Sequence, residues 1–209
     1  MHRQKIIIVT PALADANNGN WQTAKRWRQM LAPAYRVQLA AAWPGGDGPP
    51  GRWAGGGLGP ADEAALLIAL HARRSAPSVV AWRVAHPPRP LLLVLTGTDL
   101  YRDIHDDPVA QRSLALADAL VVLNALGARS LPAALRAKCH VLLQSCPARQ
   151  PLAKPTRHLR ALMVGHLRSE KDPLTYLRAA QRLAGRSDIR LDHIGSALDA
   201  GLGAQASAL

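Results

Sequence analysis

The sequence contains no phenylalanine, only two cysteines in 209 residues, and only 14 acidic residues against 26 lysines and arginines. Cys139 and Cys146 cannot build a disulfide framework and show no zinc-ligand spacing, so a reducing cytoplasm fits. No apolar run approaches the roughly 20 residues that a membrane-spanning helix needs. A hydrophobic content of 48% is too high for a disordered basic tail. We therefore expect a soluble globular protein of one large domain or two small ones.

The net charge of +12 comes mainly from arginine, because the chain has only five lysines. Such a charge is compatible with nucleic acid, an anionic membrane or small anions as the partner. An excess of Arg and Ala with few Lys and no Phe is also what a GC-rich coding sequence produces, without functional meaning. The total charge alone therefore does not identify a partner.

Apolar runs of strand length alternate with helical patterns along the first part of the chain. Residues 2–9 imitate a signal peptide, but Pro11 ends the apolar stretch and three consecutive Ile residues favour a buried strand. A Gly- and Pro-rich stretch from Trp43 to Pro60 predicts a long loop, of a kind that often serves as a lid or binding loop. The expected strands are 5–10, 35–41, 65–70, 91–95, 120–123 and 139–144, and the expected helices are 21–31, 74–85 and 108–117. This alternation predicts an α/β fold with a doubly wound parallel sheet and ligands at the carboxyl ends of its strands.

A second alternation follows a Pro- and Arg-containing linker at residues 145–158. It comprises strands 159–164 and 189–194, a helix over 173–183 and a final Ala-rich helix. Two strands and two helices cannot bury both faces of a sheet. We therefore expect a first domain over 1–150 and an incomplete second domain over 151–209.

The loop between the first strand and the first helix is a candidate anion site. Gly19 can adopt positive φ and Asn20 is a good helix cap, which leaves backbone N–H groups exposed at the helix start. Such a terminus attracts anions, and Thr23 and Lys25 add a hydroxyl and a positive charge. The dinucleotide fingerprint GxGxxG is absent here. The alternative is an ordinary helix cap after a turn.

Two further candidate segments directly follow buried strands. In His71–Arg74, two Arg residues would open a helix, where their charge opposes the dipole and needs an anion or a carboxylate. Thr96–Asp99 gathers two hydroxyls and a carboxylate around a glycine, with Arg102 close by. The structural alternatives are a buried His71, and Asp99 as a cap or turn residue.

The loop Val164–Pro173 opens the second domain. Pro173 suits the first turn of a helix, and Asp172 suits its cap. Arg168 and Lys171 would stand over this helix start, where a diphosphate would fit. All four candidate loops follow strands and therefore fall on the same edge of their sheets.

The fourth loop resembles the GRL-x-x-EKG loop of glycosyltransferase family 4, and Thr96–Asp99 resembles the HGTD loop of those enzymes. The segments PALADANNGNWQTAKRW, IALHARRS, LTGTDLYRD and MVGHLRSEKDP are most similar to one branch, the selenosugar synthases of selenoneine biosynthesis. The resemblance covers essentially the whole chain. It implies the GT-B fold, in which one Rossmann-like domain binds the acceptor and a second binds the nucleotide sugar.

The resemblance implies transfer of a sugar from UDP-GlcNAc or UDP-glucose to selenophosphate, giving a seleno-sugar, phosphate and UDP. No metal or other cofactor is expected, and the partners are these small molecules together with cytoplasmic enzymes that make selenophosphate and use the seleno-sugar. Our hypothesis assigns acceptor binding to Gly19, Asn20, Thr23, Lys25, His71 and Arg74, catalysis to Lys25, Thr98 and Asp99, and binding of the donor diphosphate to Arg168 and Lys171.

The chain departs from the family pattern at several positions. Thr96 stands where many members have His, His166 where they often have Arg, and Asp172 where the loop ends in Gly. The chain also ends at Leu209, before the EX7E element of the family. We therefore expect a truncated chain with little or no transferase activity alone.

Two alternative functions remain open. A related GT-B glycosyltransferase would use another small thiol or hydroxyl acceptor. A nucleic-acid-binding protein is suggested by the pI near 11.0 and by the aromatic and basic residues of 21–28. Against the second, the Arg residues are dispersed and no known nucleic-acid module is present.

Overall fold

The computed structural model describes residues 3–13, 18–43, 53–54 and 64–209. It divides into two compact units, unit 1 (Met1–Pro147) and unit 2 (Ala148–Leu209), and each is described by itself. Among the helices in the described ranges, none is long and apolar enough to cross a membrane.

Unit 1 is built on a seven-stranded sheet with the order β3-β2-β1-β4-β5-β6-β7. The strands are β1 (Lys5–Val9), β2 (Arg36–Ala40), β3 (Trp53–Ala54), β4 (Ala64–Leu70), β5 (Leu91–Leu95), β6 (Ala119–Val122) and β7 (Cys139–Val141). The helices are α1 (Gly19–Leu31), α2 (Ala76–Ala85), α3 (Ile104–Asp106) and α4 (Pro108–Leu116), with a π-helical turn over Asp99–Asp103. Six strands are parallel, and β3 pairs antiparallel with β2.

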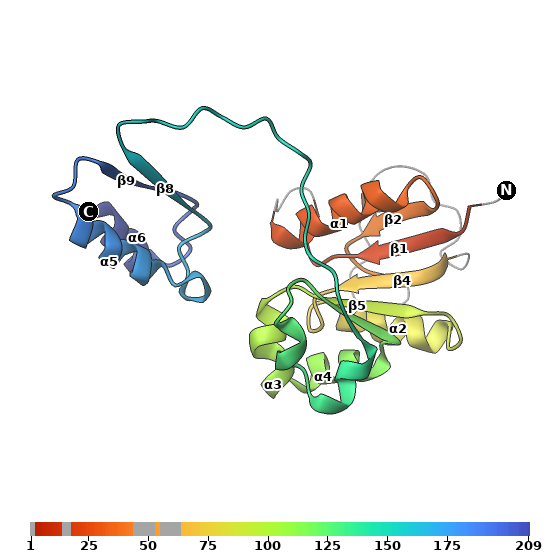
Figure 1. Ribbon diagram of the computed structural model, residues 1–209. Coiled ribbons are helices and arrows are strands. Elements are labelled where there is room, and N and C mark those ends of the chain that lie inside the picture. The colour runs from red at the N-terminus through yellow and green to blue at the C-terminus, as the bar shows by residue number, and fades with distance from the viewer. Residues whose placement is uncertain (1–2, 14–17, 44–52, 55–63) are drawn as a thin grey trace. The chain divides into compact units, whose positions relative to one another are not determined.

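The alternation of side chains along β1 explains why this strand is apolar from Ile6 to Val9. Ile7 and Val9 belong to the core layer that contains Val79 of α2 and Leu114 of α4, whereas Ile8 belongs to the layer beneath α1. Figure 1 shows α1 on one face of the sheet and α2 and α4 on the other. A parallel strand covered on both faces needs apolar residues at every position. The predicted Rossmann-like α/β fold of unit 1 is therefore confirmed.

The expected long loop from Trp43 to Pro60 is partly wrong. Trp53 and Ala54 form β3, which pairs with the end of β2. Two residues are too few to give an alternation that could be recognised in the sequence. Residues 44–52 and 55–60 of this predicted loop lie outside the described residues.

Two other element boundaries differ from the expected ones. β7 ends at Val141 rather than at residue 144, because its partner β6 ends at Val122 and Leu142 makes the last backbone bond to that strand. The helix expected from residue 74 begins at Ala76, because residues 71–75 form a turn instead. Both differences lie where an element meets a loop.

Unit 2 contains a parallel pair, β8 (Leu159–Val164) and β9 (Ile189–Ile194), with helices α5 (Pro173–Leu183) and α6 (Ala200–Ser207). The bounds of β8, β9 and α5 match the expected ones. Leu162 and Val164 of β8 and Ile194 of β9 are each more than half exposed. The described part of unit 2 therefore leaves apolar strand side chains uncovered.

Candidate functional site

At the carboxyl edge of the unit 1 sheet, Asp99 joins the loops that follow β4 and β5. Its side chain is completely buried. One carboxylate oxygen accepts a hydrogen bond from the backbone N–H of Ala72 at 2.8 Å, and the other accepts one from the backbone N–H of Thr96 at 2.8 Å. Hydrogen bonds to a charged acceptor are roughly twice as strong as neutral ones. The geometry therefore favours a positioning role for Asp99, as in the structural alternative, over direct contact with a ligand.

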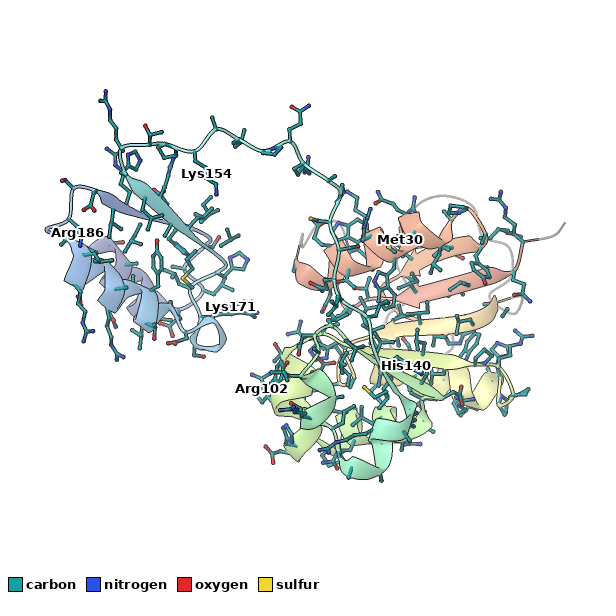
Figure 2. All side chains as sticks on the ribbon, in the orientation of Figure 1. Met30, Arg102, His140, Lys154, Lys171 and Arg186 are labelled. Atoms are coloured by element: carbon teal, nitrogen blue, oxygen red, sulfur yellow. The ribbon has the colours of Figure 1, made fainter. Side chains whose placement is uncertain are left out.

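The residues of the π-helical turn differ in burial. Asp99, Leu100 and Asp103 are buried, while Tyr101 and Arg102 are exposed. Figure 2 shows Arg102 on the outer surface of unit 1 near α3. A π-helical turn is rare and occurs frequently at functional sites.

Gly97 and Thr98 lead into this turn. Gly97 has a φ of 123°, which strains any residue with a side chain. Among the described residues, no atom outside Thr96–Thr98 lies within 4 Å of the position that a Cβ would take. Thr98 is half-buried in a helical conformation just before the turn. The backbone of this loop therefore borders open space at the edge of the sheet.

His71 is buried and has a left-handed backbone with a φ of 76°. Its Nδ1 accepts a hydrogen bond from the N–H of Arg74 at 3.3 Å, so Nε2 carries the proton of the neutral ring and lies 3.9 Å from a carboxylate oxygen of Asp103. Burial lowers the pKa of His71, the charge of Asp99 works against this, and the charge of Arg74 adds to it. This environment suits the buried structural histidine that the sequence left open.

The two arginines of this segment do not open a helix, which corrects the prediction. They lie in the turn before α2, whose cap position is Ser75. Arg73 forms an ion pair with Asp107 at 2.7 Å, so a carboxylate meets its charge. The Arg74 side chain is exposed.

The start of α1 also differs from the expected cap. Asn18, not Asn20, occupies the cap position, and its side chain accepts a hydrogen bond from the N–H of Trp21 at 3.1 Å. Gly19 and Asn20 are the first two residues of the helix, and Gly19 does not adopt positive φ. Their N–H groups lie in the first turn, which has no acceptors within the helix itself. An anion-attracting helix start is therefore present, with its cap two residues earlier than predicted.

Thr23 and Lys25 differ sharply in their surroundings. Thr23 is buried, donates to the carbonyl of Gly19 at 2.9 Å and accepts from the side chain of Gln144 at 2.9 Å. Its hydroxyl therefore ties α1 to the segment after β7, which Arg26 also contacts through Ser145. Lys25 is exposed on the second turn, and helical side chains tilt toward the helix start.

In unit 2 the loops after β8 and β9 are joined directly through their backbones. Gly165 and Gly195 have φ values of 155° and 157°, and a Cβ on Gly195 would lie 2.0 Å from the carbonyl oxygen of Gly165. The N–H of Ser196 donates to Nδ1 of His166 at 3.0 Å. Only glycine at position 195 permits this approach.

Lys171 stands over this pair of loops. A Cβ on Gly165 would lie 3.8 Å from Cγ of Lys171, so the aliphatic part of this exposed lysine passes across the end of β8. Arg168 precedes it and is half-buried. These two residues lie in the loop between β8 and α5, as the sequence predicts.

Asp172 occupies the cap position of α5 and Pro173 the first position, as expected. The carboxylate of Asp172 accepts from the hydroxyl of Thr175 at 2.8 Å instead of capping a backbone N–H. Its φ of 47° lies in the left-handed region that glycine adopts without strain. The resembling family has glycine at this position.

Two residues at the carboxyl edge of unit 1 were missed by the sequence reasoning. The side chain of Asn124, just after β6, donates to the hydroxyl oxygen of Tyr101 at 2.7 Å. Asn124 directly follows the strand expected over 120–123. Its position at a strand end could therefore have identified it as a candidate site residue from the sequence. The outward direction of Tyr101 depends on the π-helical turn, which no sequence pattern indicated.

Several basic residues serve the fold of unit 1. The ammonium group of Lys138 donates to the carbonyls of Leu114 and Ala117 at the end of α4, at 2.8 and 2.6 Å, and burial lowers its pKa. The guanidinium of Arg136 donates to the carbonyl of Leu131 at 3.0 Å. Part of the excess charge therefore satisfies backbone carbonyls and needs no external partner.

An apolar pocket of about 600 Å³ lies between α1 and the sheet, away from these loops. Its walls include Ile6, Leu66 and Leu92, which lie near the amino ends of their strands, and Trp27 of α1. Trp21 and Trp27 also pack against the core layer beneath α1. The aromatic residues of 21–28 therefore face the interior, which weakens the nucleic-acid interpretation.

We expect Asp99→Ala to lower the free energy of unfolding by about 2–5 kcal/mol, because it leaves the N–H groups of Ala72 and Thr96 buried without their acceptor. Urea unfolding measures this change. The matched control is Asp106→Ala, which removes an exposed carboxylate in α3 and should change the value by less than about 0.5 kcal/mol. Equal effects of the two variants would contradict the role given to Asp99.

We expect acid to destabilise the chain partly through His71. Since its folded pKa lies below the ordinary value of 6.5, the unfolded chain takes up a proton that the folded chain resists as the pH falls below that value. The contribution of His71 to the free energy of unfolding is therefore fully present above this pH and is lost as the pH falls below it. His71→Asn keeps a side chain that tolerates positive φ and should flatten the decline. Urea unfolding as a function of pH measures this effect, and His105→Asn at an exposed position is the control. An unchanged pH dependence in His71→Asn would contradict the role given to His71.

The candidate site thus consists of two sets of loops, each at the carboxyl edge of a parallel sheet. In unit 1 they surround Gly97 and the start of α1, and in unit 2 they surround Gly165 and Lys171. Neither the comparison with models of protein families nor that with curated proteins finds a match for this chain.

Proposed function

We propose that this chain is a GT-B type glycosyltransferase that moves a sugar from UDP-glucose or UDP-GlcNAc to selenophosphate. The observation that carries the proposal is the position of Lys171. Its aliphatic stem crosses Gly165 at the carboxyl end of β8, and the residue lies two positions before the first residue of α5. Open parallel sheets bind their ligands at that edge. The resemblance of both edge loops to glycosyltransferase family 4 supports the same assignment.

The donor side is assigned to unit 2. Helix α5 begins at Pro173, and the side chain of Asp172 does not cap its first turn. The N–H groups of that turn are suited to an anion, and Lys171 adds a positive charge beside them. Arg168 is proposed as the second basic group for the departing diphosphate. Stabilisation of developing negative charge is a principal means of catalysis in such a site.

The acceptor side is assigned to unit 1. The first turn of α1, with Gly19 and Asn20, offers backbone N–H groups, and Lys25 can reach back toward them. Arg74 is exposed at the neighbouring strand end. Thr23 and Asp99 are proposed to position these loops, because their polar atoms are engaged within the protein. Thr98 is proposed as the hydroxyl of this loop that meets the ligand, because the Thr96 hydroxyl donates to Asp99 at 3.4 Å.

The proposed chemistry requires little proton transfer. Selenium attacks the anomeric carbon, a C–Se bond forms, the C–O bond to the diphosphate breaks, and UDP leaves with the electron pair. Water then cleaves the Se–P bond and releases phosphate. Because a soft, anionic nucleophile needs no general base, Thr96 can stand where the resembling enzymes carry His. The protein contributes mainly positive charge and orientation.

A related acceptor is the competing possibility within this reaction class. Selenophosphate, thiophosphate, cysteine and malate differ in charge and in their nucleophilic atom, so titration with each one separates them. A site built around Lys25 and a helix start favours the phosphate-containing acceptors.

We expect Lys25→Ala to weaken binding of selenophosphate about fivefold and to leave binding of UDP-glucose unchanged, because each lysine is assigned to one ligand. Lys171→Ala should show the reverse pattern. Isothermal titration calorimetry of the 209-residue chain measures both affinities.

Lys154→Ala is the matched control, since Lys154 is exposed in the segment before β8 (Figure 2) and should alter neither affinity. The reverse pattern for Lys25→Ala would contradict the assignment of the acceptor side. Failure of the parent chain to bind either ligand would contradict the proposed function.

A further inference from the structure

Tyr101 and Asn124 form a polar pair at the carboxyl edge of unit 1. The proposed reaction assigns no role to either residue. Tyr101 lies in the π-helical turn after β5, and Asn124 follows the neighbouring strand β6. The Asn124 side-chain amide donates to the Tyr101 oxygen at 2.7 Å. The Tyr101 side chain is 55% exposed, so the pair faces solvent rather than the core.

The direction of this hydrogen bond is fixed by a second contact. The Oδ1 atom of Asn124 accepts from the backbone N–H of Leu126 at 3.1 Å, which leaves the Nδ2 group to face Tyr101. The phenol oxygen is therefore the acceptor in this pair. Its own proton points elsewhere and can be donated to a bound molecule.

The pair borders the open space beside Gly97. The N–H of Tyr101 donates to the carbonyl of Gly97 at 2.9 Å, so the two residues lie one helical turn apart. In the described part of the chain, a Cβ on Gly97 would have no atom within 4 Å apart from those of residues 96–98. A ligand at this edge can therefore meet the loop backbone, the exposed ring and the phenol together.

The three charged residues of the π-helical turn have partners within the protein. The carboxylate of Asp99 accepts from two backbone N–H groups, and Asp103 forms an ion pair with Arg102 at 2.9 Å. The Tyr101–Asn124 pair itself offers a ligand a hydroxyl, an amide and an exposed aromatic ring. Such groups suit a neutral polyhydroxylated molecule, because tyrosine supplies both an apolar ring face and a polar hydroxyl. The start of α1, in contrast, suits an anion.

We propose that Tyr101 and Asn124 bind the sugar ring, with the phenol of Tyr101 donating to a sugar hydroxyl and its ring lying against the sugar face. This proposal rests on the proposed function in one respect, that the bound molecule is a hexose of the kind that the proposed reaction uses. It adds a neutral sugar subsite, at the β5–β6 end of the edge, to the anion sites.

Saturation-transfer NMR of the 209-residue chain with free glucose and free N-acetylglucosamine tests this proposal. Tyr101→Phe removes only the phenol oxygen and should weaken sugar binding about fivefold to tenfold, the usual effect of one lost hydrogen bond. Asn124→Asp should cause a similar loss, because a carboxylate accepts the phenol proton instead of directing it to the ligand. Tyr35→Phe, beside the apolar pocket, is the control and should bind like the parent chain.

Unchanged sugar affinity in Tyr101→Phe would overturn the proposal, and so would an absence of sugar binding by the parent chain. Urea unfolding of each variant shows whether a loss reflects binding, since Tyr101→Phe at an exposed position should leave stability within about 0.5 kcal/mol. Binding of UDP-glucose and selenophosphate by the same chain tests the proposed function separately. A chain that binds those two ligands but neither free sugar would contradict this inference alone.

Discussion

The buried carboxylate of Asp99 is the interaction on which the carboxyl edge of unit 1 depends. A buried charge without partners destabilises a fold by several kcal/mol, so Asp99 requires the N–H groups of Ala72 and Thr96 in fixed positions. This requirement joins the loops after β4 and β5. It also fixes the start of the π-helical turn, from which Tyr101 projects outward. The geometry of the candidate site therefore follows from one internal side chain.

Unit 2 joins its two edge loops by a different means. Gly195 allows its own backbone to approach that of Gly165 so closely that any side chain would collide with the carbonyl oxygen. Backbone contact thus replaces the carboxylate of unit 1. Lys171 then lies across the joined loops, where the field of α5 and the lysine charge combine. In both units the neighbouring edge loops are therefore joined to each other by contacts within the protein.

The sequence was sufficient for elements whose signal is local. Residues 91–95 and 159–164 were placed correctly because short, predominantly apolar runs of that length are typical of strands. Asp172 and Pro173 were placed by their helix-start preferences. It was insufficient where the partner lies far along the chain. Thr23 bonds to Gln144, and Asp99 bonds to Ala72, and neither long-range partner could be recognised from the sequence. The α1 cap was misplaced because Asn18 and Asn20 have the same preference.

The central claim is that Asp99 locks two loops into a platform at the edge of the sheet. Amide hydrogen exchange at Ala72 and Thr96 tests it most directly, because both N–H groups donate to this carboxylate. We expect both amides to exchange as slowly as those within β4 and β5. Exchange as fast as that of the exposed segment at residues 148–157 would contradict the account.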